Sequence, residues 1–237
     1  MQVVHEPQEH YLVVQQKLKG QCSSVYLTIL SVIQGVALAD LALIVANNAQ
    51  QFTFTQWMQV LLTFGALIMT WQQYTMHIIS LEWIPDLRDA FIPFGIGACE
   101  LFLNHLIPQR LVAWLLVLAL LSALGALAAW HGERQASKEV ENLPLLTGLR
   151  RRFHVLMGSN LGAMLFLLLL ALESVLGHVQ AAQPLTTIQG GLAFVIVLLV
   201  AASSSGLFLV TVWYWQAVVT YARTGHMPGK QPQQPGT

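Results

Sequence analysis

The stretch Ala90–Ile107, AFIPFGIGACELFLNHLI, decides the fold, because it is apolar enough to lie in a membrane and yet contains Glu100, Asn104 and His105. A carboxylate inside hydrocarbon costs about 3 kcal/mol or more, so such a residue points first to a functional site. Two other apolar segments carry one carboxylate each, Asp40 and Glu173. We therefore expect the remaining helices to pack around these three groups.

The composition agrees with a membrane protein. Charged residues make up 9% of the 237-residue chain and hydrophobic residues 55%, whereas globular domains have roughly 25% charged residues. The mean hydropathy is +0.60. These values predict an all-α polytopic membrane protein in the lipid bilayer, with one helical bundle. The net charge of zero gives no indication of a nucleic-acid partner.

Six apolar segments are long enough, or in the third case nearly so, for the ~20 residues of a spanning helix. They cover residues 25–47, 57–81, 90–107, 111–131, 153–178 and 188–215. Pro85 and Pro108 separate the second, third and fourth of them.

The flanking segments differ from these spans. Residues 1–24 carry Tyr11, Val14 and Leu18 at helical spacing, which predicts an amphipathic juxtamembrane helix, and they lack the apolar centre of a cleavable signal peptide. The composition of residues 224–237 predicts a disordered tail.

The basic residues indicate the orientation. The connection 132–152 carries five of them, whereas 48–56 and 179–187 contain neither Lys nor Arg. With six spans, the positive-inside rule then places both termini and the connection 132–152 in the cytoplasm, as expected for an inner-membrane protein. Within that connection Arg150, Arg151 and Arg152 are also candidates to contact anionic lipid headgroups.

The candidate ion or proton path begins with the three carboxylates. On this topology Asp40, Glu100 and Glu173 share the outer half of the membrane, and none of the six segments contains a Lys. Without cationic partners they are either protonated at rest or attract a cation or a proton. In the third segment, the polar residues that follow Glu100 are Asn104 and His105, four and five residues later.

Two further patterns concern the second and fifth segments. Thr70, Gln73, Tyr74 and His77 lie along one helical face, which could line a wet cavity or hydrogen-bond to a neighbouring helix. Gln73 and His77 would then continue the path towards the cytoplasm. Gly158 and Gly162 form a small-xxx-small pattern, which favours close helix packing.

Enzyme motifs are missing from the sequence. It contains no Gly-x-Ser-x-Gly, His-Glu-x-x-His or P-loop pattern, and its two cysteines, Cys22 and Cys99, do not have metal-ligand spacing. We therefore expect neither enzymatic activity nor a bound cofactor or metal.

The layout resembles the six-helix bacterial relatives of the lysosomal potassium channel. Trp71 and His77 near the end of the second segment and Pro93-Phe94 in the third are similar to that family, whereas Ile33-Gln34-Gly35-Val36 lacks the Arg, Phe and Asp of its first-helix signature. The resemblance implies a potassium-conducting oligomer.

The sequence thus predicts a channel or transporter for a proton or a monovalent cation, using the intramembrane carboxylates. The alternative is a non-enzymatic subunit or sensor that docks a larger membrane complex. A third class, an intramembrane enzyme acting on lipid, would need a cavity that joins Glu100 and His105 to the lipid phase. Whether the protein forms a homo-oligomer or binds other membrane subunits stays open.

Overall fold

The computed structural model describes residues 6–81, 87–180, 209, 212–213 and 215–220. All regular secondary structure in these residues is helical, which confirms the all-α prediction for them. The elements in chain order are α1 (Glu6–Asn48), α2 (Phe54–Ser80), α3 (Leu87–Leu106), α4 (Leu111–Ala136), the 3-10 helix η1 (Val140–Asn142) and α5 (Leu143–Gln180). The predicted sixth span, 188–215, lies almost entirely outside the described residues, and the tail, 224–237, lies wholly outside them.

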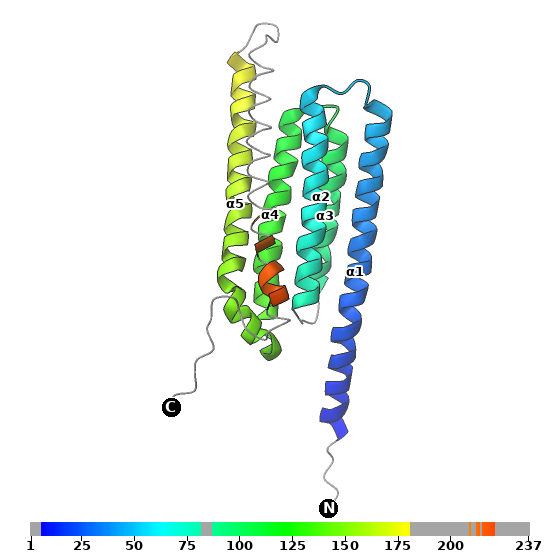
Figure 1. Ribbon diagram of the computed structural model, residues 1–237, viewed down its shortest axis with the longest axis vertical. Coiled ribbons are helices and arrows are strands. Elements are labelled where there is room, and N and C mark those ends of the chain that lie inside the picture. Colours follow the sequence, from blue (N-terminus) through cyan, green and yellow to red (C-terminus); the bar gives the residue numbers. More distant parts are fainter. Residues whose placement is uncertain (1–5, 82–86, 181–208, 210–211, 214, 221–237) are drawn as a thin grey trace, which may run out of the picture.

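The five α-helices run side by side and alternate in direction (Figure 1). The connections 49–53 and 107–110 lie at one end of the bundle, which we call the upper end, and residues 137–142 lie at the other, lower end. Connections this short force consecutive helices to pack antiparallel. α1 packs against α2 and α3, α3 against α4, and α4 against α5. α1 and α3 therefore run parallel to each other.

Three of the described helices are long and apolar enough to cross a membrane: Ser24–Asn48, Leu111–Ala136 and Phe153–Val175. They correspond to the predicted first, fourth and fifth spans. The predicted third is the shorter apolar helix Phe91–Leu106. The predicted second, α2, is a 27-residue helix, but its glutamines and His77 make it less apolar than these three.

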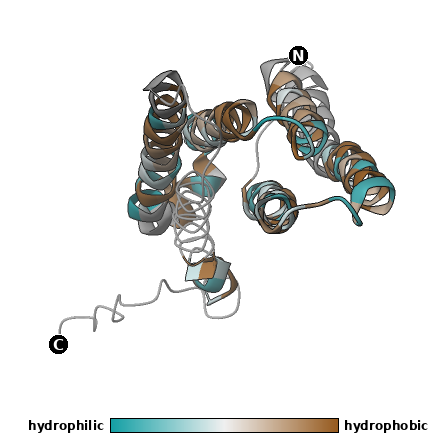
Figure 2. Ribbon diagram, turned by 90° about the horizontal axis from the view of Figure 1, so that it is seen from above, coloured by the Kyte–Doolittle hydropathy of each residue, from teal (hydrophilic) through white to brown (hydrophobic). Residues whose placement is uncertain are grey.

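The bundle carries large apolar side chains on its outside, and its largely apolar interior also contains polar ones. Glu100, Asn104, Thr63 and Gln59 are all buried. Large apolar side chains are exposed on every long helix, among them Val32, Val36, Leu43, Phe64, Ile68, Phe91, Phe94, Phe102, Leu116, Leu120, Leu165, Leu169 and Leu172. Figure 2 shows hydrophobic residues recurring along each coloured helix. This distribution suits a hydrocarbon solvent and indicates a membrane protein.

Two apolar clusters hold the helices together. The larger one surrounds Trp114, which is fully buried and donates from Nε1 to Thr63 Oγ1 at 3.1 Å, so that α4 is bonded to α2. The smaller one lies near the lower end and includes Met76, Leu81 and Phe153, together with Ala217 and Val218 of the helical residues 215–220. These late residues therefore pack against the beginning of α5.

The helices extend beyond the apolar segments. α1 continues without a break from Glu6, so residues 6–24 of the predicted juxtamembrane segment are one helix with the first span. α4 ends at Ala136 and α5 begins at Leu143, so most of the predicted loop 132–152 is helical. Glu133 joins these two helices, because its carboxylate lies 3.6 Å from Arg150 Nε and 3.5 Å from His154 Nε2.

Two glycines of α3 provide a test of how closely α1 and α3 pack. A Cβ added at Gly97 would collide with Ile33 Cγ2 of α1, whereas one at Gly95 would meet Leu124 Cδ1 at an ordinary 3.7 Å. Both changes to Ala gain up to ~1 kcal/mol of helix propensity, but overpacking at Gly97 costs about 1–3 kcal/mol. We expect Gly97→Ala to unfold at a lower temperature than Gly95→Ala in detergent. Equal unfolding temperatures would contradict the close approach.

Candidate functional site

Glu100 lies at the point where α1, α2 and α3 meet. Its side chain is 0% exposed, and Gln34 of α1 is 4% exposed. Gln34 Nε2 donates to both carboxylate oxygens, at 2.9 Å to Oε1 and 2.8 Å to Oε2. Thr70 of α2 makes a further side-chain hydrogen bond to Glu100. Both groups are neutral, so the carboxyl group is held by hydrogen bonds from two neighbouring helices.

Asn104 makes a second set of hydrogen bonds between α3 and α1, one turn of α3 closer to the upper end. Its Nδ2 donates to the Ala37 carbonyl oxygen at 2.9 Å and to Asp40 Oδ2 at 3.0 Å. The other oxygen of Asp40 lies 3.5 Å from His105 Nε2. His105 is 62% exposed and Asp40 18%, so this second set of contacts reaches the surface. We call Gln34, Asp40, Glu100, Asn104 and His105 the α1–α3 polar cluster.

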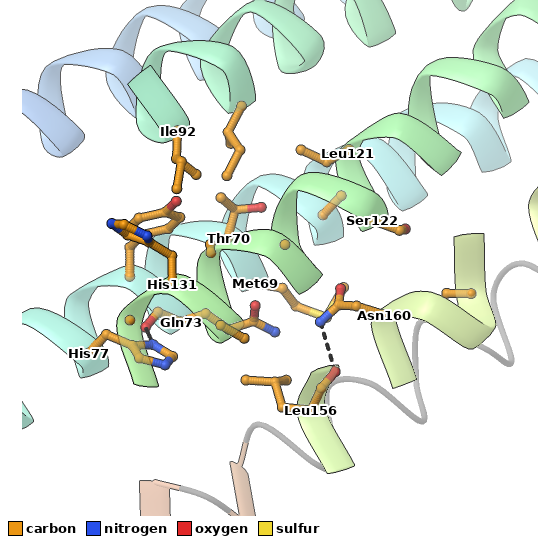
Figure 3. Close-up of a pocket in the computed structure, with 18 of the residues that line it drawn as sticks. Met69, Thr70, Gln73, His77, Ile92, Leu121, Ser122, His131, Leu156 and Asn160 are labelled. Carbon is orange, nitrogen blue, oxygen red and sulfur yellow. Dashed lines mark hydrogen bonds between the residues drawn. The ribbon is translucent and has the colours of Figure 1, made fainter. Parts of the chain in front are cut away.

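A cavity of about 110 Å³ lies between α2, α3, α4 and α5 (Figure 3). A water needs roughly 10–15 Å³ by this measure, so the cavity has room for several waters. Its apolar wall includes Met69, Ile92, Leu121 and Leu156. Its polar lining comes from Thr70, Gln73, Tyr74, His77, Ser122, His131 and Asn160.

Several of these polar side chains are held in place by their own helices. His77 Nδ1 lies 2.7 Å from the Gln73 carbonyl oxygen, and Asn160 Nδ2 donates to the Leu156 carbonyl at 3.0 Å. The ring of His77 also packs edge-on against Phe153, with 5.1 Å between the ring centroids. The cavity thus has fixed polar groups on α2 and α5.

Thr70 connects the polar cluster to the cavity. It hydrogen-bonds to Glu100 and also lines the cavity. Figure 3 shows it between Ile92 and Ser122, above Gln73 and His77 in the view. A polar side chain therefore lies between the buried carboxyl group and a space that can hold water.

The structure brings most of the predicted path residues into one of these two features. Asp40, Glu100, Asn104 and His105 lie in the cluster, and Gln73 and His77 line the cavity. Glu173 is different: it is exposed on α5, which packs against α4.

Sequence reasoning missed the contributions of Gln34, His131 and Asn160. The signal for Gln34 was its place on the first apolar segment, six residues before Asp40. His131 ends the fourth apolar segment, and Asn160 stands between the two glycines of the fifth. Each is a polar residue in or at the end of an apolar segment, where it needs a partner or a wet cavity.

The other predicted residues lie elsewhere on α5. Gly158 and Gly162 are exposed, and a Cβ added at either would meet no atom within 4 Å. Because the sixth segment lies almost entirely outside the described residues, their packing role stays a prediction. Arg150 approaches Glu133 and Arg151 is exposed, while the side chain of Arg152 lies outside the described part.

A double-mutant cycle tests the bond between α1 and α3. Gln34→Leu would leave a buried carboxyl group without its amide donor, and Glu100→Leu would leave a buried amide without its acceptor. A hydrogen bond to a charged group contributes about 1.5–3 kcal/mol. We therefore expect each single variant to unfold at a lower temperature, and Gln34→Leu/Glu100→Leu to lose less than the sum of the two. Additive losses would show that the pair is not coupled.

No protein-family model matches the chain, and comparison with curated proteins and with solved structures also finds no match.

Proposed function

We propose that this protein is a channel or transporter that passes a proton or a monovalent cation through the interior of its helical bundle. The observation that carries the proposal is the connection at Thr70, which joins the α1–α3 polar cluster to the cavity. Polar groups are costly inside an apolar bundle. Here polar side chains recur between Asp40 and His77, in the α1–α3 polar cluster and along the cavity wall.

These polar side chains have different roles. Asp40 and His105 receive the ion or proton near the upper end, because Asp40 is partly exposed and carries a carboxylate. Glu100 is the buried binding group. Gln73 and His77 line the cavity that leads towards the lower end.

The proposed topology has six spans, both termini in the cytoplasm and the lower end facing the cytoplasm of a bacterial-type cell. Among the side chains that the structure describes, Arg134, Lys138, Arg150 and Arg151 lie near the lower end, and Arg110 near the upper end. The excess of basic residues supports this orientation.

Ion flux into proteoliposomes tests the proposal. Dyes would report protons, potassium and sodium separately, and potassium is the ion that the family resemblance implies. We expect Asp40→Asn/Glu100→Gln to reduce the flux at least tenfold, since both carboxyl groups between the upper end and the cavity are removed. Glu173→Gln is the matched control, because Glu173 is exposed outside the cluster. Wild-type flux in the folded double variant would contradict the path.

The shape of α1 favours a second candidate function, a subunit or sensor that docks a larger complex. At ~1.5 Å per residue, the 43 residues of α1 span about 65 Å, against about 40 Å for the 26 residues of α4. Figure 1 shows α1 extending beyond the lower end of the bundle. A projecting helix of this kind could bind a partner protein.

Purification under mild conditions separates the two functions. A docking role predicts that another protein co-purifies in a fixed ratio and that removal of residues 1–20 abolishes the co-purification. It also predicts that the purified protein alone conducts no ion. Conduction by the purified protein would favour the transport function.

A further inference from the structure

We propose that Glu100 carries a proton rather than a metal cation, and that Gln34 is the positioning residue that accommodates Glu100 in both of its protonation states. The inference rests on the proposed transport function and names the species transported. It follows from the hydrogen-bond chemistry around one carboxyl group, which differs from that of a cation site.

The groups around Glu100 do not suit a metal cation. A dehydrated potassium or sodium ion needs several oxygen ligands in place of its hydration shell. Instead, the amide nitrogen of Gln34, a hydrogen-bond donor, lies 2.9 Å and 2.8 Å from the two carboxylate oxygens. A cation bound to those oxygens would have to displace this donor, and the fully buried carboxyl group leaves no exposed side from which it could approach.

Gln34 can satisfy either form of the carboxyl group. The ionised form only accepts hydrogen bonds, and Nε2 donates to both of its oxygens in the observed arrangement. The protonated form also donates one. Gln34 Oε1 is buried without a hydrogen-bond partner, and rotation of the amide about its last torsion, which is broad, would let it accept that proton while Nε2 still donates to the other oxygen.

Thr70 provides a route for the proton. A hydronium ion in the cavity gives a proton to Thr70 Oγ1 as the hydroxyl proton of Thr70 passes to a Glu100 oxygen. The hydronium becomes water, Thr70 is unchanged, and the carboxylate becomes a carboxylic acid. On the upper side, Asn104 donates to the Ala37 carbonyl and to Asp40, so it separates Glu100 from the Asp40–His105 pair.

Other titratable groups surround this site and must be distinguished from Glu100. The buried Cys99 thiol precedes it on α3, and the Asp40–His105 pair lies beyond Asn104. Tyr74, His77 and His131 face the cavity from α2 and α4. An infrared band of a protonated carboxyl group is specific to the carboxyls, and its loss in Glu100→Gln assigns it to this residue.

The experiment combines a pH titration of that band with proton, potassium and sodium flux, all on the full-length protein in proteoliposomes. Gln34→Met keeps the length of the side chain but removes the amide. The amide's charge-assisted hydrogen bonds to the ionised carboxylate are stronger than those it makes with the neutral acid. Because the ionised form therefore loses more, we expect the titration midpoint and the pH profile of proton flux to move to higher pH by one unit or more, a tenfold change in the equilibrium. Gln59→Met is the matched control, since Gln59 is another buried glutamine, on α2 and outside the cluster, and should leave both unchanged.

The remaining outcomes separate this inference from the transport function itself. If the protein conducts potassium or sodium but no protons, and Glu100→Gln abolishes that flux, the transport function stands. The assignment of a proton as the transported species would then be wrong. A Glu100 band that titrates identically in Gln34→Met would overturn the role of Gln34. Absence of flux for every ion would overturn both proposals.

A second variant covers the case in which Gln34→Met does not fold. Thr70→Val has nearly the same shape but no hydroxyl group. We expect it to lower proton flux at least tenfold in folded protein, because the proton loses its route from the cavity. Unchanged flux would overturn the route.

Discussion

The carboxyl group of Glu100 constrains the rest of this structure, because a fully buried ionisable group must find hydrogen-bond partners among its neighbours. α3 cannot supply them alone. Gln34 has to come from α1 and Thr70 from α2, so the burial of one residue determines how three helices face each other. Gly97, one turn before Glu100, helps to make this possible, since any larger residue there would collide with Ile33 of α1.

The apolar exterior strengthens the influence of the buried hydrogen bonds on how the helices are arranged. In a bundle whose exposed surface is rich in Leu, Phe and Val, the surrounding hydrocarbon offers a polar side chain no alternative partner. Interior hydrogen bonds therefore select one arrangement of helices among many that apolar packing would allow. The bond from Trp114 to Thr63 acts in the same way between α4 and α2. It also fixes Trp114 in the core of the bundle.

The sequence identified the residues of the site better than their partners. Glu100, Asn104 and Asp40 stood out because each is a polar residue in an apolar segment, and in the structure each of them bonds across the contact between α1 and α3. Spacing along one helix says which side chains share a face, but not which helix that face meets. For that reason Gln34, His131 and Asn160 could be seen in the sequence without being assigned to the cluster or the cavity. The apolar segments also do not mark where the helices end, since α1, α4 and α5 continue as helix beyond them.

The cost of the buried site argues that it does more than hold helices together. Well-packed hydrophobic residues often replace a buried ionic pair with no loss of stability, so α1 and α3 do not need a carboxyl group to be held together. A carboxyl group has one property that an amide lacks, the ability to gain and lose a proton. The cluster keeps that group in contact with Thr70, beside a cavity large enough for several waters. A purely structural link would not need the cavity, and this combination is the physical reason to look for transport here.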